Sequence, residues 1–87
     1  MDLQALRLEI DQIDTELVTL FCRRMAIAAA IGVYKAEHDL PIHVPAREYE
    51  KLQQVTQLSG EEYAPYIKSL YETMFTLSKS YQNEVVK

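Results

Sequence analysis

The chain has 87 residues, of which 48% are hydrophobic and 25% charged, and its formal net charge is −4. This length allows one small domain, residues 1–87, and the composition is that of a folded protein, which excludes a disordered chain. The negative charge disfavours nucleic acid as a partner, because a phosphate-binding face needs a surplus of basic residues.

Apolar residues recur at alternating steps of three and four from Leu3 to Tyr34. They are Leu3, Leu6, Ile10, Ile13, Leu17, Leu20, Ile27, Ile31 and Tyr34, and Arg24 occupies the one remaining place in the series. A spacing of 3.5 residues is typical of a helix that packs against other helices. Because Asp2 is a suitable N-cap and no proline precedes Pro41, we predict one helix from about residue 3 to about residue 37.

This first helix would be about 50 Å long, which is more than the width of a compact domain of this mass. The fifty residues that follow cannot cover its apolar stripe, so we expect a second copy of the chain to pack against it. Gly32, which follows Ala28, Ala29 and Ala30, predicts the close approach of another helix.

Prolines and a glycine divide the chain after the first helix into a loop and two further helices. Residues 38–45 are predicted to form an extended loop, and Pro45 suits the first position of a second helix that ends near Leu58, before Ser59 and Gly60. Pro65 then falls in the first turn of a third helix that extends to about Glu84. No segment has the period of two that marks a strand, so we predict an all-α fold with one long, one short and one medium helix.

The sequence also favours a cytoplasmic protein without a membrane partner. Its start lacks a basic region leading into an apolar stretch, and no apolar run is judged long enough to cross a membrane. The single Cys22 excludes an intrachain disulfide and, within an apolar run, is predicted to fill the core.

Arg24 is the least expected residue of the first helix. A guanidinium cannot lose its proton, so its burial is costly unless an anion meets it. No acidic residue lies within one turn on either side. The partner is therefore either a carboxylate from elsewhere in the fold or from a subunit interface, or a bound ligand.

Helical geometry indicates which other cations of the first helix could bind the same ligand as Arg24. Lys35 lies eleven residues after Arg24 and points the same way, about 16 Å along the axis, so the two could hold opposite ends of a small anion. The alternative is a solvated lysine near the helix end. Arg7 lies about 25 Å before Arg24, so it either serves a site completed by a neighbouring subunit or pairs with Asp11 at the surface.

Further candidates lie on the second and third helices. Arg47 and Glu48 fall in the first turn of the second helix, where exposed amides favour an anion; alternatively, they belong to a solvated charged face that continues through Lys51. Ser78 and Gln82 share a face beside the apolar seam, where they are either satisfied by the backbone or offered to a ligand.

The candidate set contains cations, neutral donors and one carboxylate. It provides no Ser-His-Asp set, paired carboxylates, glycine-rich phosphate loop or metal cluster, and His38 and His43 lack partners at metal-ligand spacing. We therefore expect a pocket for a multiply anionic compound. Such a pocket could catalyse a unimolecular reaction by restraining its substrate and stabilising developing charge.

An ordered set of motifs resembles the all-α (AroQ-type) chorismate mutases over essentially the whole chain. The motifs are Leu6-Arg7-x-x-Ile10-Asp11-x-Ile13-Asp14, Arg23-Arg24, Ile31-Gly32-x-x-Lys35, Pro45-Ala46-Arg47-Glu48 and Ser78-x-x-x-Gln82. The resemblance implies an intertwined homodimer with paired first helices, in which each active site borrows an arginine. It also implies the Claisen rearrangement of chorismate to prephenate, on the route to phenylalanine and tyrosine, without a cofactor, a metal or a covalent intermediate.

The resemblance also implies a role for each candidate. Arg24, together with Arg7 of the partner subunit, would bind the two carboxylates of chorismate. Lys35 would reach a carboxylate and the ether oxygen, to which Gln82 would also donate.

The resemblance assigns the other candidates to the ring end. Arg47 and Ser78 would hold that end, and Glu48 would accept a hydrogen bond from the ring hydroxyl. Val44 stands where relatives often have aspartate, but the family contact there is a backbone amide, which valine retains.

Two other functions remain open at this point. An isochorismate-pyruvate lyase has the same fold and a similar basic pocket, and a non-catalytic dimerisation or effector-binding module would place Arg24 in an interface ion pair. Since 87 residues leave no room for a fused dehydratase, dehydrogenase or synthase, we expect a monofunctional enzyme.

Overall fold

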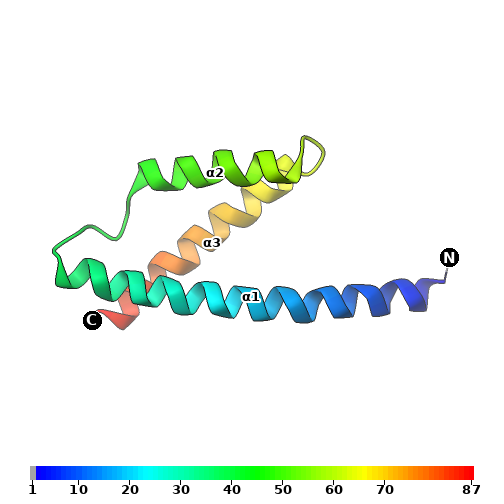
Figure 1. Cartoon of the computed structure of the whole chain (residues 1–87), viewed down its shortest axis with the longest axis horizontal. Helices are drawn as coiled ribbons and strands as arrows, with labels where there is room; N and C mark the ends of the chain where they lie inside the picture. The colour runs from blue at the N-terminus through cyan, green and yellow to red at the C-terminus, as the bar shows by residue number, and fades with distance from the viewer. Residues whose placement is uncertain (1) are drawn as a thin grey trace.

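The computed structural model describes residues 2–87 as three helices, α1 (Leu3–Glu37), α2 (Pro45–Ser59) and α3 (Ala64–Val85), joined by two short loops (Figure 1). Within this range there is no strand, which confirms the predicted all-α class. Each predicted helix boundary lies within one residue of the observed one.

Local signals explain where the helices begin and end. The Asp2 side chain accepts a hydrogen bond from the Gln4 amide at 3.1 Å and caps α1. Pro45 opens α2 after the extended Val44, because a proline at the first helical position loses no backbone hydrogen bond. Gly60 ends α2 with a φ of 80°, a left-handed conformation that glycine adopts without steric cost.

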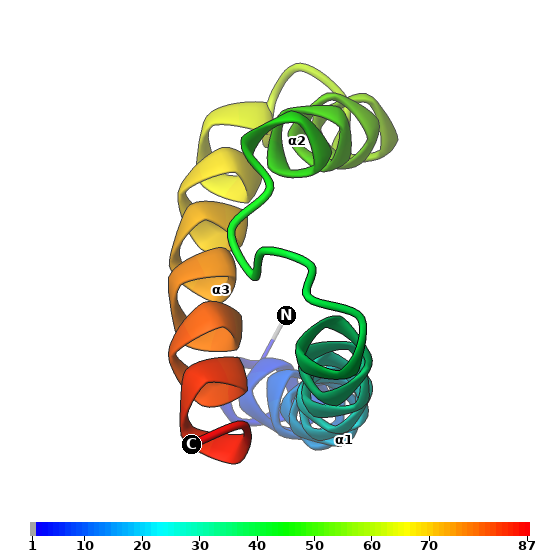
Figure 2. The ribbon, with the colours of Figure 1, turned by 90° about the vertical axis from the view of Figure 1, so that its left-hand side faces the viewer.

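The third helix holds the molecule together. α3 packs against α1 at one end and α2 at the other, whereas α1 and α2 do not pack on each other within the described residues. Figure 2 shows α3 as the wall that connects them, with the loop of residues 38–44 closing one side. This arrangement leaves α1 and α2 facing each other across a space.

Gly32 lies at a tight contact between α1 and α3. A Cβ atom added to Gly32 would lie 3.0 Å from Cγ and 3.1 Å from Cβ of Gln82 on α3. Ala28, one turn earlier, is buried in the same contact. The predicted close helix approach at Gly32 is therefore confirmed.

The apolar stripe of α1 is not covered by the chain itself. Its nine apolar members are all 38–62% exposed, and the N-terminal end of α1 extends beyond the other two helices (Figure 1). The radius of gyration is 16.0 Å, against about 12 Å for a compact chain of this length. The accessible surface is 7026 Å², against about 5,300 Å² for a folded monomer of this mass. An isolated chain therefore leaves an unusually large apolar surface in water.

Two expectations about α1 were wrong. Cys22 is exposed rather than in the core, because the side of α1 that packs on α3 runs through Phe21, Met25 and Ala28, and Cys22 lies about 100° around the helix from Phe21. In addition, we expected no apolar run long enough to cross a membrane, but α1 meets that criterion by length and composition. A long core helix of a soluble protein meets the same criterion.

Candidate functional site

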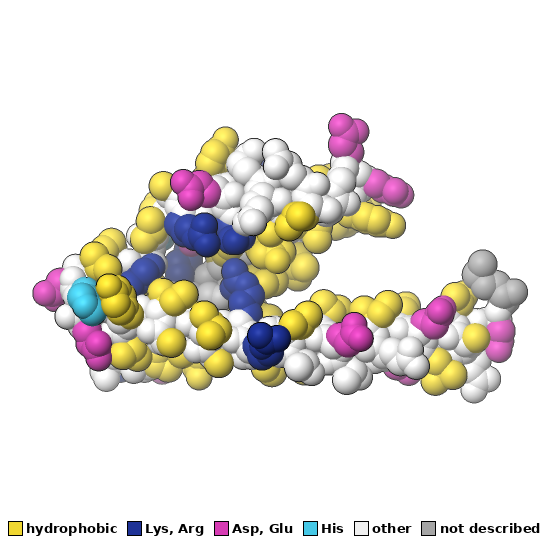
Figure 3. All heavy atoms as spheres, viewed as in Figure 1, with side chains coloured by type: hydrophobic (Ala, Val, Ile, Leu, Met, Phe, Trp, Pro, Cys, Tyr) yellow, Lys and Arg dark blue, Asp and Glu magenta, His cyan; other side chains and the backbone are white. Residues whose placement is uncertain are grey.

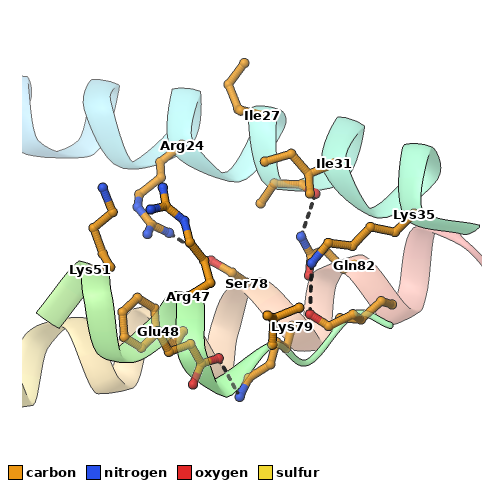
Figure 4. Close-up of a pocket in the computed structure, with 14 residues that line it drawn as sticks. Arg24, Ile27, Ile31, Lys35, Arg47, Glu48, Lys51, Ser78, Lys79 and Gln82 are labelled. Atoms are coloured by element: carbon orange, nitrogen blue, oxygen red, sulfur yellow. Dashed lines mark hydrogen bonds and ion pairs between the residues drawn. The ribbon is translucent and has the colours of Figure 1, made fainter. Parts of the chain in front are cut away.

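A cavity of about 430 Å³ lies in the space between α1 and α2, with α3 as its floor. In the space-filling view, lysine and arginine side chains gather in this hollow, between more apolar surfaces (Figure 3). Its walls come from all three helices and the α1–α2 loop (Figure 4). Its apolar part consists of Ile27, Ala28, Ile31, Ile42, Val44 and Phe75.

The α3 contribution follows from helical spacing. Four residues of α3 line the cavity, and they begin with Phe75. The other three follow it by three, four and seven residues, so all four share one face of the helix; they are Ser78, Lys79 and Gln82. Ser78 and Gln82 are the two buried polar residues of the described chain. The predicted shared face of Ser78 and Gln82 is thus confirmed.

Arg24 is half-buried in the cavity wall on α1. Its Nη1 donates to Ser78 Oγ at 3.1 Å, and the guanidinium carbon lies 5.7 Å from the centre of the Tyr71 ring. Within residues 2–87 no carboxylate oxygen lies within ion-pair distance of it. The expected alternative of an ion pair inside the chain is therefore not observed, and the positive charge faces the cavity.

Lys35 and Gln82 lie at the other end of the cavity (Figure 4). Lys35 Nζ donates to the carbonyl oxygen of Ile42 at 3.1 Å, and Gln82 Nε2 donates to that of Ala28 at 2.9 Å. An ammonium group has three hydrogens and an amide group two, so each side chain retains at least one donor for a ligand. Lys35 is half-buried rather than the solvated lysine of the alternative reading.

Two residues of the first turn of α2 also line the cavity. The Arg47 side chain extends from α2 toward Arg24 on α1 (Figure 4). Glu48 Oε2 accepts a hydrogen bond from Lys79 Nζ at 2.9 Å, in an ion pair that connects α2 to α3. These residues are therefore part of the cavity wall and not only of a solvated helix face.

Among the charged residues of the cavity, the sequence interpretation missed two, Lys51 and Lys79. Lys51 was named only as part of the alternative solvated face, although it lies four residues after Arg47 and shares its side of α2. Lys79 was assigned no role, although it lies three residues before the candidate Gln82. In both cases helical spacing was the available signal.

The cavity is strongly positive. Its wall holds five cationic side chains and one carboxylate, a local charge of +4 on a chain whose net charge is −4; the cations are Arg24, Lys35, Arg47, Lys51 and Lys79. Cations occur at both ends, and the wall between them is largely apolar. This arrangement suits a small organic anion with more than one negative group.

Arg7 is the one candidate that lies outside the cavity. It is exposed on the N-terminal half of α1, about 25 Å along the helix from Arg24. Because α1 is straight, Arg7 and Arg24 of one chain cannot contact the same small ligand (Figure 1).

Comparison with known proteins gives a family match over most of the chain. A family model described as chorismate mutase type II matches residues 6–83. The bifunctional chorismate mutase/prephenate dehydratase of Aquifex aeolicus is 44% identical over 62 residues, which are 71% of this chain and 17% of that protein. The T-protein of Haemophilus influenzae is 38% identical over 84 residues, 94% of this chain and 22% of that protein. The chain thus spans about a fifth of the length of these relatives, and no solved structure gives a significant match.

Proposed function

The chain belongs to the type II chorismate mutase family, and from this premise we propose that its cavity catalyses the rearrangement of chorismate to prephenate. The observation that carries the proposal is Arg24, a half-buried guanidinium that faces the cavity without a carboxylate partner in residues 2–87. A dianionic substrate would supply the missing negative charge.

The proposed reaction needs no nucleophile, general base or metal ion. In this Claisen rearrangement the ether carbon–oxygen bond breaks while a carbon–carbon bond forms within the same molecule, so no proton, leaving group or electron is exchanged with the enzyme. Catalysis then depends on holding the reactive conformer and stabilising negative charge on the ether oxygen. A restrained, cation-rich cavity suits both tasks.

The two ends of the cavity suggest how chorismate is held. Arg24 would bind one carboxylate, with Arg7 of the partner subunit at the other. Lys35 would contact a carboxylate and the ether oxygen, and Gln82 would donate its second amide hydrogen to that oxygen. The hydrogen bonds to Ile42 and Ala28 support this assignment, because they fix both donors at one end of the cavity.

The ring of chorismate would lie near α2. Arg47 and Ser78 would hold this end, and Glu48 would accept the ring hydroxyl with the carboxylate oxygen that Lys79 leaves free. The backbone amide of Val44 would supply a further donor. The position of all four residues in the cavity wall supports these roles.

The proposal includes a homodimer in which α1 of one chain packs against the other chain and carries Arg7 into its cavity. Two observations support it: the exposed apolar stripe of α1, and an accessible surface about 1,700 Å² larger than expected for a folded monomer. Burial of that excess on each chain would give an interface in the range of obligate dimers. We also propose a cytoplasmic location, because the partner expected at the apolar stripe is a second chain rather than a lipid bilayer.

The deciding experiment incubates the purified protein with chorismate and, separately, with isochorismate. We expect prephenate from chorismate; pyruvate release from isochorismate without prephenate formation would instead identify a lyase. The Arg24→Ala variant should remain folded and dimeric but lose turnover. Loss of the dimer, with no catalytic activity in the wild-type protein, would identify a structural module.

A further inference from the structure

Lys51 is a cavity residue to which neither the motifs nor the proposed reaction gives a role. It lies in the second turn of α2, is half-buried, and lines the cavity. Arg47 lies one turn before it on the same side of the helix. The question is why a second cation stands at this point of the wall.

Helix stability does not explain Lys51. Like charges four residues apart repel each other on a helix surface. Arg47 and Lys51 have this spacing on α2, which runs from Pro45 to Ser59. An uncharged residue at position 51 would suit the isolated helix better.

The neighbouring acids do not neutralise Lys51. Glu48 lies three residues earlier, but its carboxylate is paired with Lys79. Glu50 is adjacent in sequence and therefore faces another direction. Lys51 Nζ donates to the neutral Gln54 Oε1 at 2.7 Å, and within residues 2–87 it has no carboxylate at ion-pair distance. Its charge remains available.

Lys51 lies at the Arg24 and Arg47 end of the cavity, whereas Lys35 and Gln82 lie at the opposite end (Figure 4). We propose that Lys51 is a substrate-binding residue, whose ammonium group binds the carboxylate held at the Arg24 end. The inference rests on the proposed function for the identity of the substrate. It adds to this end of the cavity a cation from the same chain, mobile on its flexible stem and able to follow a carboxylate that enters.

The test compares Lys51→Met with Lys51→Arg and with the control Lys68→Met. Methionine removes the charge at similar length, arginine retains it, and Lys68 is an exposed lysine on α3 that does not line this cavity. For Lys51→Met we expect KM for chorismate to rise about tenfold, the typical effect of losing one charged hydrogen bond, with kcat changed less than about twofold. Lys51→Arg should recover most of the affinity, and Lys68→Met should match the wild type.

Calorimetric binding of prephenate, with thermal unfolding of each variant, separates this inference from the proposed function. A wild-type protein that does not convert chorismate would reject the proposed function. In that case, weaker prephenate binding by Lys51→Met alone would still support a carboxylate contact at Lys51. A KM and a prephenate affinity within twofold of wild type in folded Lys51→Met would overturn the inference. So would equal losses in Lys51→Met and Lys68→Met.

Discussion

Lys79 Nζ lies 2.9 Å from Glu48 Oε2 and joins α3 to α2 across one wall of the cavity. Both side chains are 26% exposed, so the pair is partly shielded from water. The contact occupies one carboxylate oxygen and fixes the direction of the other. We therefore expect Lys79 to act on the cavity through Glu48, as a positioning residue.

We predict that Lys79→Met weakens substrate binding more than it weakens the fold. Without the ion pair, Glu48 loses its fixed orientation and leaves a carboxylate uncompensated in the cavity, where it repels a dianionic substrate. We expect KM for chorismate to rise at least about fivefold and the free energy of unfolding to fall by no more than about 1 kcal/mol, as for partly exposed pairs. Steady-state kinetics and urea unfolding measure the two effects.

The conservative variant Lys79→Arg is the control for this prediction, because it keeps the charge that Glu48 requires. It should recover most of the affinity. A purely structural ion pair would instead change the unfolding midpoint and leave KM unaltered.

The three helices were predictable because each depends on local signals. Asp2, Pro45 and Gly60 mark helix ends through backbone chemistry that needs no tertiary contact. Arg24 was recognisable as unusual because it interrupts an apolar series. The resemblance drawn from the ordered motifs is confirmed by the family match over residues 6–83.

Other parts of the site depend on packing that periodicity does not specify. Spacing places Lys51 beside Arg47 and Lys79 beside Gln82, but it does not show which side of each helix faces the cavity. The Glu48–Lys79 ion pair joins positions 31 residues apart on different helices. Cys22 was misplaced for the same reason, since the orientation of α1 relative to α3 decides which of its apolar residues are covered.

Gly32→Ala should reduce catalysis through Gln82. The new methyl group would lie 3.0–3.1 Å from the Gln82 side chain, so the side chain or α3 must shift. Alanine favours the helix by about 0.5–1 kcal/mol, whereas overpacking a tight contact costs about 1–3 kcal/mol, so we expect a net destabilisation of about 1 kcal/mol. Because Gln82 is the proposed donor to the ether oxygen, kcat should fall about tenfold or more.

Single-turnover kinetics and thermal unfolding of Gly32→Ala test this prediction, and Gly60→Ala provides a contrast. Gly60 has open space around it but a φ of 80°, so alanine there should lower stability through backbone strain without changing kcat. A Gly32→Ala protein with the wild-type kcat would show that Gln82 can move without loss of function.

Mixing Arg7→Ala with Arg24→Ala tests whether the site is shared between subunits. Each variant alone should be inactive. A hybrid dimer would contain one site with both substitutions and one site with neither, so random exchange at equal amounts should restore about a quarter of the wild-type activity. Native mass spectrometry confirms that subunits have exchanged. Exchange without recovery of activity would reject an active site that borrows Arg7.

The pH dependence of activity should reveal the chemistry of Gln82. An amide does not titrate, so it donates equally well from mildly acidic to mildly alkaline conditions, and the pH profile of kcat should be nearly flat over that range. In Gln82→Glu a carboxyl group replaces the amide at a buried position, and it donates only when protonated. We expect burial, and the hydrogen bond that only the protonated form can donate to the Ala28 carbonyl, to raise the pKa of this introduced carboxyl above its ordinary value of about 4.3 against the opposing effect of Lys35 at the same end of the cavity.

Activity of Gln82→Glu should therefore be highest at acidic pH and fall as the pH rises through that raised pKa. The same protonation is needed to keep the hydrogen bond to the Ala28 carbonyl, so thermal stability should fall in the same direction. Profiles of kcat and of melting temperature for both proteins test the assignment. A steep alkaline loss of kcat near neutrality in the wild-type protein would show that a titrating group, and not the amide of Gln82, provides the essential donor.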